Sequence, residues 1–183
     1  MAKVLAIRGW NAILNIHERR IPASLPDAGA LLETLAGPSD RLWPHERWPA
    51  MILDRGLSVG SAGGHRAIRY RLAEHVPGRR IDFTFEAMPH LRLFRGHHRF
   101  EVIEDDDAVL LRHTIDVRTS PATWIHWKIF IEAIHDALIE DAFDKAERGL
   151  GVTGRPRSRW PLRVRLLRWW RALQAKRMPG SPR

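Results

Sequence analysis

The sequence predicts an α+β fold in which an antiparallel sheet wraps around one long C-terminal helix. Two observations predict it: several short segments alternate between apolar and polar residues, and one long helical pattern follows them. The helix is expected over residues 120–149. Ser120 can cap its first turn, Pro121 suits the first helical position, and Gly149 can end it. At about 1.5 Å per residue this helix is roughly 40 Å long, enough to cross a small domain.

One face of this helix is apolar and needs a large partner. Apolar residues recur along it at spacings of three and four, so they share one face. They are Trp124, Trp127, Ile131, Ile134, Leu138 and Ala142. The alternating segments before the helix supply the partner, as an antiparallel sheet with one apolar and one charged face.

The chain before the helix begins with one strand and two short helical stretches. Residues 11–21 are predicted as a strand whose two alternating sets are equally mixed, so its inward face is not assigned. Residues 25–35 are expected as a short helix. Residues 39–54 are expected as a second helical or irregular stretch, in which Trp43 and Trp48 each precede a proline.

Further strands are predicted between these stretches and the long helix. They cover residues 57–60, 65–74, 80–87, 96–103 and 108–118. Turns are expected at Gly63 with Gly64, at Pro77 with Gly78, and over Asp105, Asp106 and Asp107. The predicted order is therefore one strand, two short helices, several antiparallel strands and a long helix.

Charge is distributed unevenly along the 183 residues. All 21 acidic residues lie before Leu150, whereas 10 of the 30 lysines and arginines lie in residues 155–183. The rest of the chain is therefore close to neutral. We expect a domain over residues 1–153 and a basic tail over residues 154–183, and any anionic partner is expected to meet the tail.

Composition and motifs exclude several classes of site. The chain has no cysteine, which excludes disulfides, zinc–thiolate sites and thiol catalysis. No nucleophile elbow, phosphate-binding loop or dinucleotide fingerprint is present, so no cofactor is expected. Residues 1–23 lack a signal-peptide pattern, and no apolar run approaches the roughly 18 residues that a membrane span needs. We expect a cytoplasmic protein, with peripheral attachment at a membrane as the alternative.

Four segments together resemble the SRPBCC superfamily, which includes START lipid-transfer domains, pollen-allergen-like proteins, and polyketide cyclases and aromatases. The segments are HERRIPASLPDAGALLETLA, LDRGLSVGSAGGHRAIRYRLAEHVPGRRIDFTFE, GHHRFEV with LLRHTIDV, and IHDALIEDAFDKAE. The resemblance covers about residues 11–149 and looks like that of a bacterial member. It implies the helix-grip fold, a curved antiparallel sheet around a long C-terminal helix, with a cavity between them for a hydrophobic small molecule.

Two interpretations of the interior follow. The sequence pattern alone favours a filled core, because apolar faces usually pack solid. The resemblance favours a cavity entered past the loops and short helices. The residues expected to line it are Trp48, Tyr70, Phe83, Phe85, His98, Phe100, His113, Trp127, Ile131 and Ile134.

Two histidines are candidates for chemistry. His98 and His113 fall on the inferred inward faces of their strands, where they would orient a ligand or act as acid and base. The alternative is that both are buried, neutral and hydrogen-bonded. His135 is expected to be a satisfied surface histidine. No metal site is predicted, because the adjacent His97 and His98 point to opposite faces of a strand.

The tail from Trp160 to Arg177 predicts an amphipathic basic helix. Its apolar side is formed by Leu162, Leu166, Trp169, Trp170 and Leu173, and its basic side by Arg165, Arg168 and Arg171. This pattern suits an anionic membrane surface. Nucleic acid is disfavoured, because the apolar residues exceed what phosphate contacts require. A helix docked on the domain and a disordered basic tail are the alternatives.

The sequence therefore predicts binding, or transport, of a hydrophobic small molecule. One alternative is an enzyme of the polyketide cyclase, aromatase or dehydratase type, with His98 or His113 as acid or base. Another is an interaction module that acts through the basic tail. The sequence does not indicate an oligomeric state.

Overall fold

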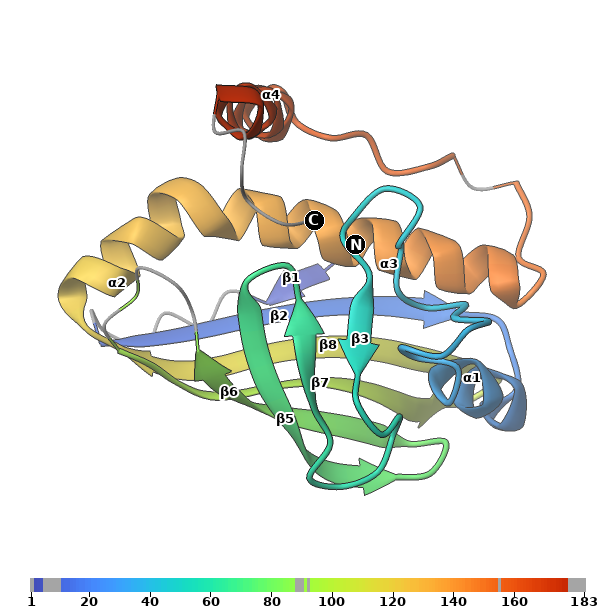
Figure 1. Cartoon of the computed structure of the whole chain (residues 1–183). Helices are drawn as coiled ribbons and strands as arrows, with labels where there is room; N and C mark the ends of the chain where they lie inside the picture. Colours follow the sequence, from blue (N-terminus) through green and yellow to red (C-terminus); the bar gives the residue numbers. More distant parts are fainter. Residues whose placement is uncertain (1, 5–10, 88–90, 92, 155, 178–183) are drawn as a thin grey trace.

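The computed structural model describes residues 2–4, 11–87, 91, 93–154 and 156–177. In this part of the chain, eight strands form one antiparallel sheet in the order β1-β2-β8-β7-β6-β5-β4-β3, and the sheet curves beneath a long helix (Figure 1). The strands are β1 (Ala2–Val4), β2 (Ala12–Ile21), β3 (Met51–Leu53), β4 (Ala62–His65), β5 (Ile68–Val76), β6 (Arg80–Ala87), β7 (Phe94–Asp105) and β8 (Ala108–Thr119).

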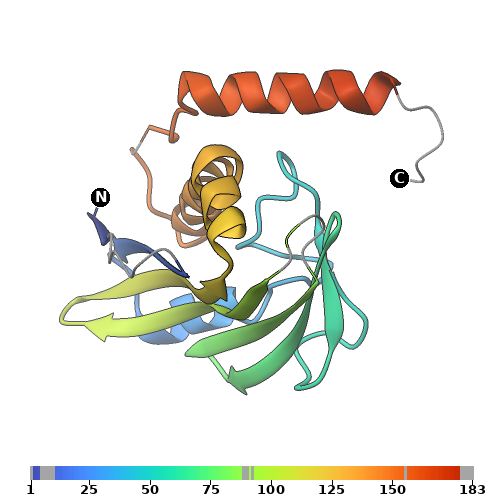
Figure 2. The same cartoon turned by 90° about the vertical axis from the view of Figure 1, so that its left-hand side faces the viewer.

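The helices are α1 (Leu25–Leu32), α2 (Pro121–His126), the π-helical segment η1 (Trp127–Ile131), α3 (Glu132–Gly149) and α4 (Leu162–Arg177). The segments α2, η1 and α3 follow one another without a break and form the long helix along the concave face of the sheet. The tail helix α4 lies on the side of α3 that faces away from the sheet (Figure 2).

The predicted ends of the long helix are confirmed. The Ser120 hydroxyl accepts a hydrogen bond of 3.2 Å from the Thr123 N–H, Pro121 is the first helical residue, and the helix ends at Gly149. The π-helical turn was not predicted. A π turn widens the helix by one residue and rotates the following face. Accordingly Trp127 and Leu138 are buried, whereas Ile131 is only partly buried.

The predicted strands and turns are largely confirmed, with one shift in position. Residues 57–60 form a loop rather than a strand, and Gly63 and Gly64 lie inside β4 rather than in a turn. The turn falls instead at Arg66, which has a φ of 55°. A Cβ atom on Gly64 would lie 1.9 Å from the carbonyl oxygen of Ile68, so this glycine allows two strands to approach closely.

One short helix follows β2, and residues 39–54, expected to be helical or irregular, form turns and loops and then the strand β3. Residues 33–50 form turns and loops without a further α-helix. The side chain of Asp40 explains this, because its carboxylate accepts hydrogen bonds from the backbone N–H groups of Ala36, Leu42 and Trp43 at 2.7–2.8 Å. Backbone donors that a side chain satisfies in this way no longer favour a helix.

The inward face of β2 is polar at its centre. Its buried residues are Ile13, Asn15, His17, Arg19 and Ile21. The three polar members meet a row of acidic side chains on α3, which are Asp136, Glu140, Asp144 and Glu147. We call these seven polar residues the β2–α3 polar seam.

Arg19 carries the strongest contacts of the seam. Its guanidinium donates to Glu140 and Glu147 at 2.7 Å each and to Asp144 at 3.3 Å. The side chain of Arg19 is only 6% exposed. Removal of one partner from a buried ionic network leaves uncompensated charge, which is far more costly than loss of a surface ion pair.

We therefore predict that Arg19→Met lowers the free energy of unfolding by about 3–5 kcal/mol. Urea denaturation followed by circular dichroism measures it. The neighbouring Arg20 is the matched control, because it lies on the other face of β2, is half-exposed and pairs with Asp105 and Asp107. Arg20→Met should change stability by less than about 1 kcal/mol. Equal effects of the two substitutions would contradict the assignment of the seam.

Candidate functional site

Aromatic and imidazole rings from four strands meet between the sheet and the long helix. His98 on β7 lies at their centre: its ring centroid is 4.7 Å from that of Tyr70, 4.9 Å from that of Phe83 and 4.9 Å from that of Phe85. The rings of His98 and Phe83 are stacked, with 17° between their planes. Pairing places Phe83 directly opposite His98 and Tyr70 opposite Phe85, so the strand register itself assembles these contacts.

The cluster continues through two more histidines to the helix. The His113 ring lies 5.8 Å from His98, 4.6 Å from Phe100 and 5.1 Å from His135. The His135 ring in turn lies 5.5 Å from that of Trp127 in η1. We call these rings the interior cluster: Tyr70, Phe83, Phe85, His98, Phe100, His113, Trp127 and His135.

Burial determines the charge of the cluster. It lowers the pKa of His98 and of His113 well below the usual value, and neighbouring histidines lower both pKa values further. Both imidazoles are therefore neutral at pH 7. Burial also raises the pKa of Tyr70, whose hydroxyl shares a hydrogen bond of 3.2 Å with Nδ1 of His65.

Three polar atoms of the cluster lack a hydrogen-bond partner within the described part of the chain. They are Nε2 of His98, Nδ1 of His113 and Nε1 of Trp127. Each of these side chains is at most 4% exposed. Buried polar groups are nearly always paired, so each of these three atoms needs a partner from outside the described residues, either an ordered water or a bound molecule.

No protein-family model and no curated protein sequence matches the chain, whereas several solved structures do. A solution structure from Thermobifida fusca is 18% identical and covers 80% of this chain and 99% of its own, with a TM-score of 0.60. The di-domain ARO/CYC StfQ from the steffimycin biosynthetic pathway is 13% identical and covers 78% of this chain and 51% of its own, with a TM-score of 0.57. Truncated norcoclaurine synthase from Thalictrum flavum is 12% identical and covers 79% of this chain and 96% of its own, with a TM-score of 0.55.

The chain has the helix-grip fold. Its predicted fold class is thus confirmed. Most of the residues expected to line a cavity lie in the interior cluster of this helix-grip domain, and Ile131 and Ile134 are partly buried against the two parts of the hydrophobic core.

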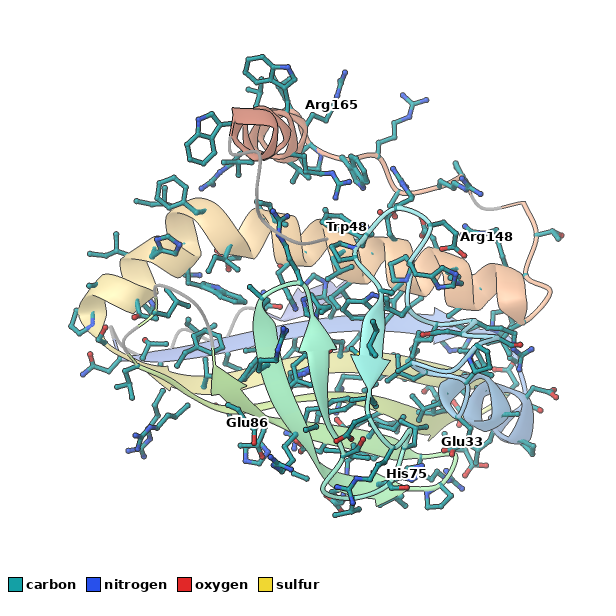
Figure 3. The ribbon with its side chains drawn as sticks, viewed as in Figure 1. Glu33, Trp48, His75, Glu86, Arg148 and Arg165 are labelled. Atoms are coloured by element: carbon teal, nitrogen blue, oxygen red, sulfur yellow. The ribbon has the colours of Figure 1, made fainter. Side chains whose placement is uncertain are left out.

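Trp48 does not join the interior cluster. It lies on the outer side of α3, between that helix and α4 (Figure 3). Its indole N–H donates to the buried carboxylate of Asp141 at 2.7 Å, and its ring packs against Trp160 and Arg168. Trp48 is thus buried between α3 and the tail, and these contacts do not place it among the rings of the interior cluster.

Sequence reasoning missed three histidines of the interior. His135 was expected at the surface, but its side chain is only 12% exposed and its ring contacts His113. His65 was missed because the turn was predicted at Gly63 and Gly64, whereas it falls at Arg66, after His65. His17 lies on the β2 face that the alternating pattern could not assign. The signal that could have found His17 is the three- and four-residue spacing of acidic side chains on α3, opposite the two-residue spacing of polar residues on β2.

The tail is docked on the helix-grip domain. Asp141 accepts hydrogen bonds from the indole N–H groups of Trp48 and Trp160 and from Arg47, at 2.6–2.9 Å. The Arg168 guanidinium lies 4.2 Å from the ring centroid of Trp48 and 4.3 Å from that of Trp160. Among the alternatives expected for the tail, residues 158–168 therefore agree with a segment docked on the domain. The side chains of residues 171–177, including the predicted Arg171 and Leu173, lie outside the described residues.

The opposite face of α4 is apolar and exposed. Its exposed apolar side chains are Leu162, Leu166, Trp169 and Trp170. Arg163 at the start of α4 donates to the backbone carbonyls of Lys128 and Ile129, so α4 begins beside η1. Of the helices that the structure describes, none combines the length and the apolar character that a membrane span requires.

We predict that the domain loses stability as the pH falls below 6.5. Burial is the main cause that lowers the pKa of His65 to about 4, and the charges of His135 and Arg69 lower it further. Between these pH values the unfolded chain binds a proton on His65 that the folded protein does not, so acid favours unfolding. The expected loss from His65 alone is about 2 kcal/mol at pH 5 and none above pH 7.

Urea denaturation at pH 7 and pH 5 measures this loss. His65→Gln should remove most of the contribution of this residue, whereas His97→Gln, at a half-exposed position on the outer face of the sheet, should not. A pH dependence that is the same in the protein and in His65→Gln would contradict the argument.

Proposed function

We propose that the protein binds a hydrophobic aromatic small molecule between the sheet and the long helix, and that the polar edge of this molecule pairs with His98, His113 and Trp127. The observation that carries the proposal is the set of three buried polar atoms in an otherwise aromatic cluster, for which the described residues supply no hydrogen-bond partner. An unpaired buried polar atom costs about 1–3 kcal/mol, which a ligand hydroxyl or carbonyl would recover.

The chemistry of the cluster supports this class of ligand. Aromatic rings supply large apolar contact area with few rotatable bonds, and they favour stacking or edge contacts with another ring. A neutral imidazole can both donate and accept a hydrogen bond, and His98 and His113 bring no charge to the ligand. Proteins of the same fold include an ARO/CYC and norcoclaurine synthase, whose names point to small-molecule biosynthesis, and this supports a small-molecule ligand here.

A second candidate is an enzyme of the cyclase or dehydratase type. The pair of His98 and His113, with ring centroids 5.8 Å apart, favours it, because either imidazole is a general acid or base in principle. However, the lowered pKa of both histidines makes them weak bases at neutral pH. Binding, including transport, is therefore the function that we favour.

We predict that His98→Leu discriminates between two probes that differ by a single hydroxyl group. Its affinity for 2-naphthol should fall about tenfold, equivalent to about 1.4 kcal/mol for one lost hydrogen bond, whereas its affinity for naphthalene should change little. Equilibrium fluorescence titration measures both. His97→Leu is the matched control, because His97 is the next residue on β7 and is half-exposed on the other face. Equal losses for both probes, or the same result with His97→Leu, would overturn the proposed role of His98.

We also propose that the protein meets an anionic membrane surface through the exposed face of α4. The docked side of α4 is held by Val164, which is buried, and by Arg168, so the apolar side faces outward. An ordinary surface helix shows the reverse arrangement. Exposed tryptophans next to exposed arginines match the chemistry of a lipid interface, where indole rings lie at the boundary and arginines meet anionic headgroups.

Sedimentation with phosphatidylglycerol vesicles tests this surface. We predict that the protein sediments with these vesicles at low salt, and that added salt weakens binding, because each basic residue contributes about 1 kcal/mol that ions screen. Trp169→Ala with Trp170→Ala should weaken binding severalfold even at low salt. Ile52→Ala, which removes an equally exposed apolar residue from β3, should not. Binding that ignores both salt and the two tryptophans would contradict the proposal.

A further inference from the structure

Two histidines and one carboxylate lie close together at the end of the β2–α3 polar seam that contains Asn15 and Asp136. Nε2 of His17 lies 3.0 Å from Oδ1 of Asp136, and Nδ1 of His135 lies 3.9 Å from the same oxygen. The three ligand atoms all lie within 4.8 Å of one another. Imidazole nitrogen and carboxylate oxygen bind Zn²⁺ at about 2.0–2.2 Å, which requires neighbouring ligand atoms to be roughly 3.4 Å apart. The three atoms therefore need only small side-chain adjustments to surround one ion.

We propose that His17, His135 and Asp136 form a binding site for a divalent transition-metal ion of the zinc type. Imidazole suits zinc and its neighbours in the first transition row, and the single carboxylate favours them over purely soft metals. The site was not predicted from the sequence, because His17 and Asp136 are far apart along the chain.

The surroundings of His17 match those of a metal-ligating histidine. Its Nδ1 lies 3.3 Å from Oε1 of Glu140, and the other oxygen of Glu140 accepts a hydrogen bond of 2.7 Å from Arg19. When Nδ1 donates its proton to Glu140, Nε2 carries the lone pair that faces Asp136. Metal-binding histidines are commonly oriented by a carboxylate on their second nitrogen in this way. Glu140 is thus a positioning residue, and Arg19 holds Glu140 in place.

Asn15 supplies a second and independent observation. Its amide nitrogen donates to Oδ1 of Asp136 at 3.0 Å, which places its carboxamide at the site. The side chain is only 2% exposed, and its Oδ1 has no hydrogen-bond partner within the described part of the chain. A buried oxygen acceptor without a donor, next to a carboxylate, is what a cation requires in its surroundings.

The proposal of a metal site and the proposal of a ligand site can be tested independently. They adjoin each other through His135, whose ring also contacts His113. However, ligand binding is argued from His98, His113 and Trp127, whereas metal binding is argued from His17, Asp136 and Asn15. Loss of metal binding in an experiment would leave the discrimination between naphthol and naphthalene unchanged.

Isothermal titration calorimetry with Zn²⁺ on the full chain, after treatment with a chelator, tests the proposal. We expect one saturable equivalent of Zn²⁺. His135→Gln and Asp136→Asn should each weaken binding at least tenfold. His97→Gln is the matched control, because it removes a histidine that lies 2.8 Å from Asp82 on the outer face of the sheet. This variant should bind Zn²⁺ as the unaltered protein does.

The absence of a saturable site would overturn the proposal, as would equal binding by the unaltered protein and the Asp136→Asn variant. A loss in His97→Gln as large as that in His135→Gln would assign the binding to surface histidines and would also overturn it. Zinc-edge X-ray absorption of the unaltered protein keeps the test decisive if a variant does not fold. It should show two imidazole ligands, and a spectrum without imidazole scattering would refute the site.

Discussion

Arg19 is enclosed by Glu140, Asp144 and Glu147, and this ionic contact fixes how the first long strand sits on the helix. Transfer of these charges from water to the interior is costly, so the arrangement is tolerated only when the partners meet in good geometry. A slip of β2 by one residue would turn Asn15, His17 and Arg19 outward together and bring the apolar Leu14 and Ile16 toward the acidic side of α3. The same register brings His17 to Asp136 and Asn15 to the same carboxylate. The position of the candidate metal site is thus a consequence of the contact that holds strand and helix together.

The helix α3 has three different sides, and each has a separate task. Asp136, Glu140, Asp144 and Glu147 face β2, whereas Leu138, Ala142 and Phe143 belong to the core. Asp141 faces the tail and pairs with Trp48, Trp160 and Arg47. Because polar residues occupy two of the three sides, the sequence of α3 lacks the pattern of a simple amphipathic helix with one apolar and one polar face. This is why the sequence pattern located the helix correctly but did not locate all of its partners.

What the sequence could predict depended on local rules. The Ser120 cap, the Pro121 start and the alternation that turns Phe83 and His98 inward are set by neighbouring residues along the chain, and the structure agrees with all three. What it could not predict depended on contacts between distant residues. The inward face of β2 can be assigned only when the acidic residues of α3 are placed opposite it. The π-helical turn η1, which precedes His135, has no clear signal in the neighbouring sequence.

Gly63, Gly64 and Trp48 also show that residue type alone does not determine position in the fold. Gly63 and Gly64 favour a turn by composition, yet they lie in β4, where Gly64 allows β4 and β5 to approach closely. Trp48 has the aromatic character of a cavity-lining residue, but its indole N–H pairs with Asp141 of α3 and its ring packs against Arg168 of α4. In both cases the residue type alone predicted a different position, because the observed one depends on a contact with another strand or helix.

The segment η1 connects the tail with the interior. A π turn shifts backbone carbonyls away from regular helical pairing, and Arg163 of α4 donates to two of them, those of Lys128 and Ile129. The same segment begins with Trp127, whose ring lies beside His135 in the interior cluster. One side of this turn therefore contacts the helix that we propose to meet lipid, and the other side contributes to the site that we propose to bind a ligand. The tail and the interior cluster, which differ in sequence position and in charge, therefore both contact the segment η1.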